Sequence, residues 1–241
     1  GYNFLPSARK VNMTENYHLR NALECDLAKP FDLIETLQNC HTVIHCAGRA
    51  HVMNSADGKK EIAKFDKINH LVTDSLAKQA VKAGVRRFIL ISTAGVMGKS
   101  SLSGFPINLD NRINPEDHYA LSKLKGEEAL KLLSEQSKMS FTVLRPPLIY
   151  GKNAPGNWRR LIKLLEYNIP LPLANIENKR SFIFIGNFVD LIIKCIDDDR
   201  AKNKTFLASD NQDISTSRLV ELLLKSENRS TRMFYLNKNL L

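Results

Sequence analysis

The sequence predicts an α/β fold, in which helices cover both faces of a parallel sheet. Three short apolar runs indicate the strands, at residues 42–47, 87–92 and 141–145, because each run is continuous rather than alternating. Between them, residues 69–83 and 119–133 place apolar side chains at intervals of three and four, which is typical of amphipathic helices. Strand, helix and strand in repetition give a parallel sheet with right-handed crossovers.

Further elements are expected at both ends of this pattern. Residues 3–8 and 17–20 are weaker strand candidates, and residues 31–37 favour a helix. Towards the C-terminus, helical spacing recurs at residues 188–196 and 215–225. The doubly wound sheet should therefore begin near the start of the chain.

The character of the sequence changes after Gly151. Prolines interrupt residues 152–180, and the elements that follow are shorter. We expect two domains: a sheet domain that spans residues 1–150, and a smaller lobe that spans residues 151–241. Within the lobe, residues 181–208 should return to the sheet.

Composition narrows the classes of function. The chain has 241 residues, 43% of them apolar, and no run approaches the roughly 18 apolar residues of a membrane span. The first residues lack the order of a signal peptide, so the cytoplasm is the expected location. The net charge of +10 suits phosphorylated ligands, but the basic residues are dispersed, and we expect no nucleic acid partner.

Cysteine and histidine give no sign of a metal site. The four cysteines include no CxxC pair, and a chain of this length does not need disulfides to stabilise its core. His41, His45 and His51 lie close together but have no matching set of cysteine or carboxylate ligands. We therefore expect neither a metal ion nor a disulfide framework.

The stretch HYALSKLKGEE, residues 118–128, carries the clearest chemical signal. Tyr119 and Lys123 are four residues apart, so a helix places the phenol and the ammonium on one face. A lone pair of this kind is also common on solvated helix faces. Ser92 and Thr93, however, follow a predicted strand, and ligands of open parallel sheets bind at the carboxyl ends of the strands. Hydroxyl, phenol and ammonium should then converge on one crevice.

Seven motifs in order resemble the extended short-chain dehydrogenase/reductases, of the UDP-galactose 4-epimerase type. They are CDL at 25–27, VIHCAG at 43–48, IN at 68–69, FILISTAGVMG at 88–98, YALSK at 119–123, LRPPLIYG at 144–151 and NKRSFIFIGNFVDLI at 178–192. The resemblance implies a Rossmann-like doubly wound sheet that binds a dinucleotide. The stretches HCAGRAHVMN and LPLANIENKRS look most like the branch found in bacterial surface-polysaccharide pathways.

The resemblance also implies roles for individual residues. Tyr119 would be the general acid/base, Thr93 would hydrogen-bond the reacting oxygen, and Lys123 would help to lower the phenol's pKa from about 10 towards neutrality. The implied cofactor contacts are Arg9, Asp26, Leu27, Ala47, Gly48, Asn69, Ser92, Tyr119, Lys123, Pro146 and Leu148. The implied substrate contacts are Thr93, Asn157 and Arg180, the last by charge-assisted bonds to phosphate. Asp26 and Asn69 could instead serve helix starts, and Arg180 could be surface charge.

One expected motif is absent from these residues. The family's fold opens with a strand and G-x-x-G-x-x-G, whose glycines let the backbone approach a pyrophosphate, and no segment of the sequence matches it. The first residues look like the family's entry into its second strand. We therefore expect the first strand and the glycine loop to be missing, as in an N-terminally truncated chain, which would be inactive by itself.

The cofactor and the reaction remain open between related possibilities. The end of the second strand, Pro6 to Lys10, has no carboxylate to accept from the ribose of NAD, which favours NADP. The general resemblance favours NAD-dependent C4 epimerisation of a UDP-hexose or UDP-N-acetylhexosamine through a 4-keto sugar. The alternatives are an NADPH-dependent reductase of a UDP-4-keto sugar and an inactive scaffold member of the family. A homodimer is also expected, through Leu71, Leu130 and Leu133 of two paired helices.

Overall fold

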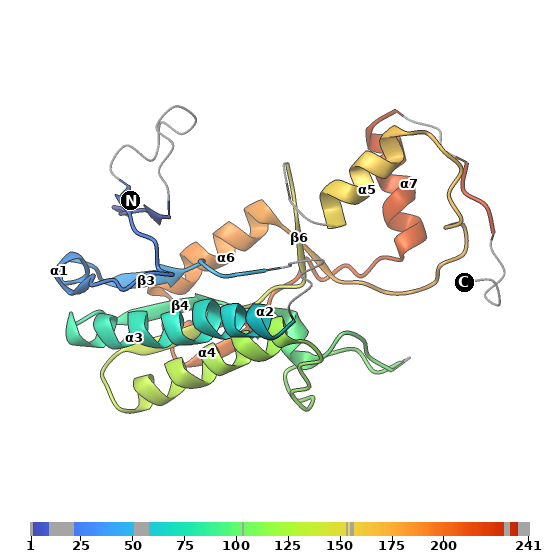
Figure 1. Cartoon of the computed structure of the whole chain (residues 1–241). Helices are drawn as coiled ribbons and strands as arrows, with labels where there is room; N and C mark the ends of the chain where they lie inside the picture. The colour runs from blue at the N-terminus through green and yellow to red at the C-terminus, as the bar shows by residue number, and fades with distance from the viewer. Residues whose placement is uncertain are drawn as a thin grey trace.

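The main sheet has four parallel strands in the order β3, β4, β5, β8 (Figure 1). Their bounds are Thr42–His45 for β3, Arg87–Ile91 for β4, Ser140–Arg145 for β5 and Lys204–Leu207 for β8. The computed structural model describes residues 2–9, 22–50, 58–102, 104–152, 154, 157–228 and 232–235. The parallel sheet and its helices confirm the predicted Rossmann-like α/β fold. Strand β8 lies within residues 181–208, which were expected to return to the sheet, although no strand was assigned there.

Helices cover both faces of this sheet. Helices α3 (Val72–Lys82) and α4 (His118–Glu135) pack on one face, and α6 (Ile185–Asp197) packs on the other (Figure 1). Neighbouring residues of β4 serve different faces, since Phe88 packs with α3 and α4 while Ile89 packs with α6. Both side chains are fully buried, which explains the unbroken apolar run in the sequence.

The helix that was predicted from residue 69 is interrupted at its start. Helix α2 (Gly58–Phe65) runs into a π-helical segment, η2 (Asp66–Leu71), before α3 begins. A Cβ on Gly126 of α4 would lie 2.5 Å from the Asn69 carbonyl oxygen, so glycine lets the two helices approach closely. Single π turns of this kind often occur at functional sites.

The N-terminal strands form a sheet of their own. Strand β1 (Ser7–Ala8) pairs in parallel with β2 (Leu23–Glu24), which was not predicted, and α1 (Ile34–Leu37) is a single turn. Within the described residues, β3 pairs with β4 alone, and its other edge has no strand partner. The strand predicted at 17–20 lies outside the described residues.

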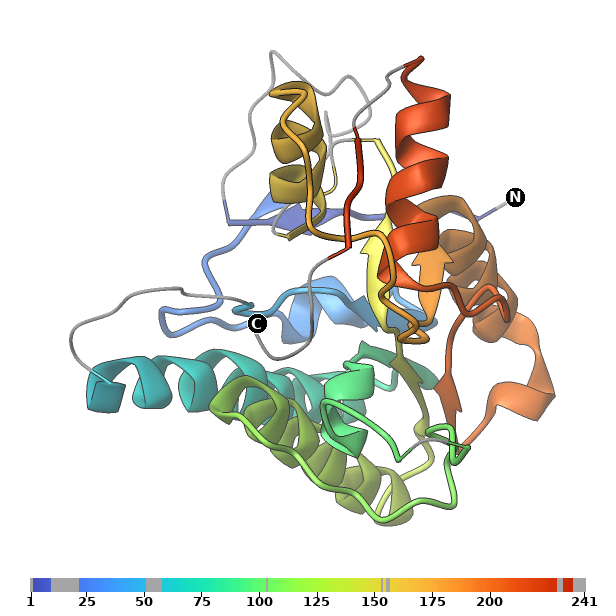
Figure 2. The ribbon, with the colours of Figure 1, turned by 90° about the vertical axis from the view of Figure 1, so that its right-hand side faces the viewer.

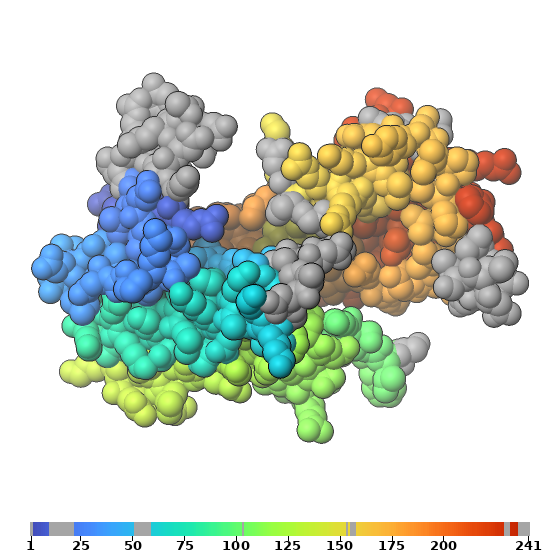
Figure 3. Space-filling model, viewed as in Figure 1, coloured from blue at the N-terminus to red at the C-terminus, as the bar shows by residue number. Residues whose placement is uncertain are grey.

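The chain after β5 builds a second group of elements, beside the sheet. Strands β6 (Leu148–Tyr150) and β7 (Phe182–Phe184) pair in parallel, while α5 (Asn157–Glu166) and α7 (Thr216–Ser226) pack through Leu165, Val220 and Leu224 (Figure 2). Figure 3 shows the part that includes α5 and α7, in yellow and red, gathered at one end of the molecule, while α6 and β8 return to the main sheet. Short 3₁₀ segments occur at η3 (Ala94–Met97) and η4 (Asp199–Ala201). None of the described helices is both long and apolar enough to cross a membrane.

Candidate active site

Tyr119 and Thr93 meet where β4 ends and α4 begins. Asp117 caps α4, because its side chain accepts a hydrogen bond of 2.8 Å from the Ala120 amide. This cap fixes the first turn, and the Tyr119 phenol is hydrogen-bonded to the side chain of Thr93. Thr93 also accepts from the Gly95 amide at 3.1 Å, which orients its hydroxyl. Both side chains are only half-buried, so a ligand can reach them.

Lys123 lies one turn further along α4, but its ammonium contacts the strand. Nζ donates to the Ile91 carbonyl at 2.8 Å, and the residue is 4% exposed. Burial is the main cause that lowers its pKa to about 8, although the charges of Cys46 and Glu127 act in the opposite direction. The lysine is therefore held under the site by the backbone of β4.

The pKa of Tyr119 differs from the expectation. Burial raises it above its usual value, the Thr93 hydrogen bond lowers it, and the nearby Asp117 charge raises it. Lys123 is not among the causes, and its ammonium donates to the Ile91 carbonyl. The pKa of the phenol is thus raised rather than lowered, so the phenol stays protonated near neutral pH unless a further positive charge comes close to it.

The loop after β3 passes over Lys123. Asn69, 1% exposed, holds this loop by accepting from the Arg49 amide at 2.8 Å and donating to the Arg49 carbonyl at 3.0 Å. A Cβ on Gly48 would lie 2.9 Å from the Lys123 Nζ, so a side chain at this position would require the ammonium to shift. Ala47 and Gly48 are exposed beside the lysine, which leaves a backbone surface where a cofactor ring can pack.

A pocket lies beside the N-terminal sheet of β1 and β2. Its volume is about 820 Å³, and Arg9, Glu24 and Asp26 contribute charged groups to its lining. The Asp26 carboxylate accepts from the Ala28 amide at 3.1 Å, so it belongs to a turn rather than to the start of α1. Arg9 and Asp26, both predicted from the sequence to contact the cofactor, thus share one pocket, and Leu27 lies in the same turn. The size and charges of this pocket fit half of a dinucleotide.

Ser92 occupies a different place from the one expected beside a cofactor. It is 4% exposed, and its Oγ donates to the Glu127 carboxylate at 2.5 Å. The same carboxylate binds Arg145 of β5 through contacts of 2.6 and 3.1 Å. Sequence reasoning missed Glu127 and Arg145, although Glu127 lies four residues after Lys123 and eight after Tyr119, on the same helix face.

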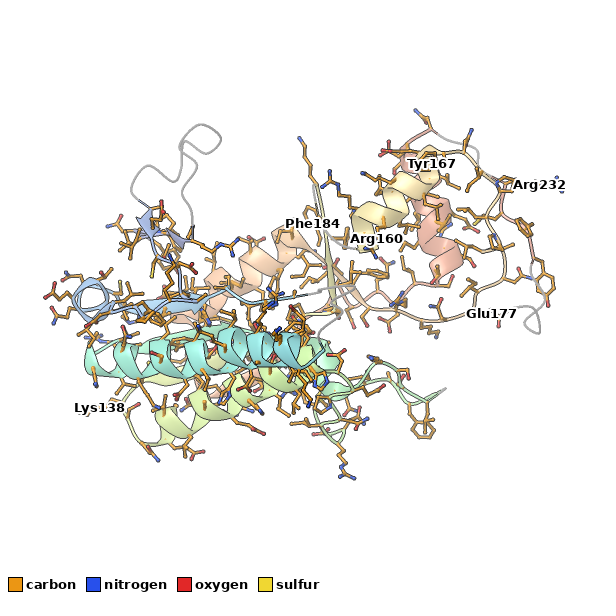
Figure 4. The ribbon with its side chains drawn as sticks, in the orientation of Figure 1. Lys138, Arg160, Tyr167, Glu177, Phe184 and Arg232 are labelled. Atoms are coloured by element: carbon orange, nitrogen blue, oxygen red, sulfur yellow. The ribbon has the colours of Figure 1, made fainter. Side chains whose placement is uncertain are left out.

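The remaining predicted residues are spread over the second half of the chain. Pro146 is buried and its carbonyl accepts from Ala94 at 2.8 Å, while Leu148 begins β6. Asn157 is the first residue of α5, and Arg180 is exposed and pairs through its backbone with Ile214. Figure 4 shows Arg160 and Phe184 on the side of this lobe nearest the sheet, with Tyr167, Glu177 and Arg232 farther out. No cluster of three or more potential metal ligands occurs in the described part of the chain.

His45, at the end of β3, gives the fold a predicted pH dependence. It is 3% exposed, its Nε2 has no hydrogen-bond partner among the described residues, and burial lowers its pKa to about 3, with a smaller effect from the Lys123 charge. An unfolded histidine has a pKa of about 6.5, so the unfolded chain binds the extra proton between these values. The contribution of His45 to stability is present above pH 6.5 and is lost as the pH falls towards 3.

We therefore expect His45→Phe to flatten the acid side of the stability profile. Wild-type protein should lose up to about 1.4 kcal/mol of unfolding free energy per pH unit through this group below pH 6.5, and the variant should not. Phenylalanine suits the site, since His45 packs edge-on against Phe88 at 6.0 Å. Denaturant unfolding at several pH values checks this, with the exposed His41→Gln as control. Parallel profiles for wild type and His45→Phe would contradict it.

Comparisons with known proteins identify related sequences and folds. A family model described as the NAD dependent epimerase/dehydratase family matches residues 2–208. A UDP-glucose 4-epimerase of Vibrio cholerae is 40% identical over 199 residues, which are 82% of this chain and 60% of that protein. The chain therefore spans 60% of the length of that relative.

Solved structures share the fold at lower identity. A UDP-glucuronic acid 4-epimerase from Bacillus cereus in complex with NAD has a TM-score of 0.75 and 20% identity, and the match covers 90% of this chain and 69% of that one. RMD from Pseudomonas aeruginosa complexed with NADPH has a TM-score of 0.69 and 20% identity, and the match covers 88% and 77% of the two chains. The family match spans most of the residues, and the chain belongs to the NAD dependent epimerase/dehydratase family.

Proposed function

We propose that the protein inverts C4 of a UDP-hexose or UDP-N-acetylhexosamine through a 4-keto sugar, in the synthesis of a surface polysaccharide. One observation carries the proposal: a reachable phenol, Tyr119, is hydrogen-bonded to Thr93, one helical turn from a buried lysine. This arrangement can move a proton to and from a sugar hydroxyl. The Vibrio cholerae relative, a UDP-glucose 4-epimerase, supports the choice of substrate class.

The chain's own residues divide the proton chemistry between them. Tyr119 Oη takes the proton of the C4 hydroxyl and later returns it, while Thr93 holds the reacting oxygen within hydrogen-bond reach of the phenol. Lys123 keeps a positive charge beneath the site, because its lowered pKa of about 8 still leaves it mostly protonated near pH 7. The hydroxyl proton and the carbon-bound hydrogen of C4 thus follow separate routes.

A nicotinamide dinucleotide supplies the acceptor and donor of the C4 hydride when it is bound. Lys123, Asn69 and the exposed backbone of Ala47 and Gly48 would hold its nicotinamide half. Arg9 and Asp26 would hold its adenine half in the pocket of about 820 Å³. Arg9 also suits the 2′-phosphate of NADP, so NAD and NADP both fit this pocket.

The second lobe would hold the nucleotide of the substrate. Asn157, at the N-terminus of α5, and the exposed Arg180 are the proposed contacts to the uridine diphosphate, because amide and guanidinium groups bind phosphate and carbonyl oxygens. Residues 151–241 are proposed as the substrate lobe on this basis, with β8 and α6 as its return to the sheet.

A reductase of a UDP-4-keto sugar is the second candidate, and the position of Arg9 in the pocket favours its cofactor NADPH. Two assays on the full-length protein separate the candidates. An epimerase converts a UDP-hexose without added cofactor, whereas a reductase leaves it unchanged and consumes NADPH when a 4-keto sugar nucleotide is supplied. A family member that serves only as a scaffold would do neither, and the hydrogen-bonded Tyr119 and Thr93 argue against that role.

We also propose that the protein forms a homodimer through α4. Leu121 and Leu132 lie on one face of this helix and are 39% and 55% exposed, and Leu71 of η2 is 51% exposed. The earlier choice of Leu130 and Leu133 was wrong, because both pack into the core between α4 and the sheet. Exposed apolar side chains arranged in this way favour a second copy as partner.

Leu132→Glu should therefore convert the dimer into a monomer. A buried carboxylate at a self-complementary interface occurs twice, so its desolvation cost is doubled. Light scattering at micromolar concentration measures the mass. Leu102→Glu is the matched control, since Leu102 is 78% exposed outside α4 and should leave the dimer intact. A monomeric wild type, or a dimeric Leu132→Glu variant, would contradict the assignment.

A further inference from the structure

The end of β4 is joined to α4 by three successive hydrogen bonds. Ile91, the last residue of β4, and the two residues after it each contact a helix residue, and the helix partners are spaced four apart: Ile91 with Lys123, Ser92 with Glu127, and Thr93 with Tyr119. A four-residue spacing puts the helix partners on one face. The contacts of Ile91 and Thr93 hold Lys123 and Tyr119, which are the lysine and the phenol of the proposed reaction. The bond between Ser92 and Glu127 joins two buried side chains.

The carboxylate of Glu127, which accepts the hydrogen bond from Ser92, has hydrogen-bond partners on both of its oxygens. Glu127 is 0% exposed, and its Oε1 accepts from Ser92 Oγ at 2.5 Å and from Arg145 Nε at 3.1 Å. Its Oε2 accepts from Arg145 Nη2 at 2.6 Å, and the Lys131 ammonium lies 3.8 Å away. Hydrogen bonds between charged partners in a buried site are short and strongly directional. Glu127 therefore holds Ser92 and Arg145 in fixed positions.

Arg145 extends these contacts to the neighbouring strand. It is the last residue of β5, is 3% exposed, and also places Nη1 2.9 Å from the Met97 sulfur of η3. The next residue, Pro146, accepts from the Ala94 amide at 2.8 Å. Helix α4 is thus joined to the ends of β4 and β5 through buried groups, and Ser92, one of these groups, directly precedes Thr93 in the chain.

We propose that Ser92 and Glu127 are positioning residues for the proton transfer, and that their hydrogen bond sets the register between β4 and α4 in which Thr93 meets Tyr119. The proposal rests on the proposed function. Without the Ser92 hydroxyl, the main-chain bonds of Ser92 and Ala94 and the Glu127–Arg145 pair remain, but the side-chain bond between α4 and the residue before Thr93 is lost. Thr93 can then shift slightly relative to Tyr119. A misplacement of about 1 Å can cost about a hundredfold in rate, so a partial shift has a measurable effect.

Ser92→Ala tests this without dismantling the core. The substitution removes one neutral donor and leaves the Glu127 and Arg145 pair intact, so the protein should still fold. In the full-length protein we expect kcat to fall by about tenfold, with KM for the UDP-sugar and the affinity for added dinucleotide within about twofold of wild type. Ser92→Cys, similar in shape with a weaker donor, should give an intermediate kcat and covers the case in which the alanine variant does not fold.

Ser134→Ala is the matched control. Ser134 is a buried serine like Ser92, 8% exposed, and its Oγ donates to Asn203 at 3.1 Å. It belongs to α4 but lies near the opposite end of the helix from Tyr119. Its loss should leave kcat unchanged, even if both serine variants lower the melting temperature alike. A change in kcat that is specific to Ser92 therefore reports on position rather than on stability.

The outcomes separate the two proposals. Absence of turnover by the wild-type protein would refute the proposed function itself. Wild-type turnover with equal kcat for Ser92→Ala and Ser134→Ala would overturn the positioning role. A large rise in the dissociation constant for dinucleotide with kcat preserved would also overturn it, because Ser92 would then be a cofactor contact.

Discussion

Tyr119→Phe in the full-length protein should lower kcat for the UDP-sugar by about 10² or more, the usual effect of losing a positioned general acid/base. The phenol is the group hydrogen-bonded to Thr93, and phenylalanine keeps its ring but cannot carry the proton. KM should change little, because the nucleotide of the substrate is proposed to bind in the second lobe. Initial rates of epimer formation measure both constants.

Tyr167→Phe serves as the control for this experiment. Tyr167 is 75% exposed in the second lobe (Figure 4), so the same chemical change there should leave kcat as in wild type. Near-normal turnover by Tyr119→Phe would remove the phenol from the mechanism. A large rise in KM with kcat preserved would instead assign Tyr119 to substrate binding.

Arg145→Met should lower the free energy of unfolding by about 3–5 kcal/mol, the usual cost of leaving one member of a buried ion pair without its partner. Glu127 would keep the Ser92 hydrogen bond but would lose both contacts to the guanidinium, and Lys131 lies 3.8 Å from it at the margin of the site. Denaturant unfolding of the full-length protein gives the difference directly.

The double variant Glu127→Leu with Arg145→Met should recover much of that loss. Apolar residues of similar volume remove the unpaired charge, and such replacements are often neutral or stabilising. Arg200→Met is the exposed control, because the Arg200 contact with Asp198 is on the surface and is screened by solvent, so its loss should leave the free energy of unfolding nearly unchanged. If Arg145→Met and Arg200→Met have equal effects, the buried pair does not stabilise the fold as described.

The sequence predicted the long elements of the fold well. Helix α4 was expected at 119–133 and occupies 118–135, and the apolar runs of β4 and β5 end within one residue of the expected bounds. Strands that are buried on both faces have continuous apolar runs, which can be recognised in the sequence without knowledge of the strands that pair with them. Strands β2, β6 and β7, of two or three residues, were not predicted, because their pairing depends on partners far away in the chain.

The site was predictable to the extent that sheet topology determines it. Thr93 and Tyr119 were expected to converge, since one follows a strand and the other starts the next helix, and the structure brings them together. The contact of Lys123 with Ile91 was not predictable, because a main-chain carbonyl has no sequence signature. Glu127 required knowledge of Arg145 on another strand, although its position one turn after Lys123 was visible in the sequence.

The most direct test of the account is proton NMR of a UDP-hexose incubated with the full-length protein in D₂O. If C4 is oxidised and reduced again, with Tyr119 moving only the hydroxyl proton, the C4 epimer should appear and should keep its carbon-bound hydrogen at C4. Hydrogens on oxygen exchange with solvent, whereas a hydride that leaves and returns to carbon does not. Deuterium at C4 of the product, or an unchanged sugar with and without added NAD or NADP, would contradict the central claim.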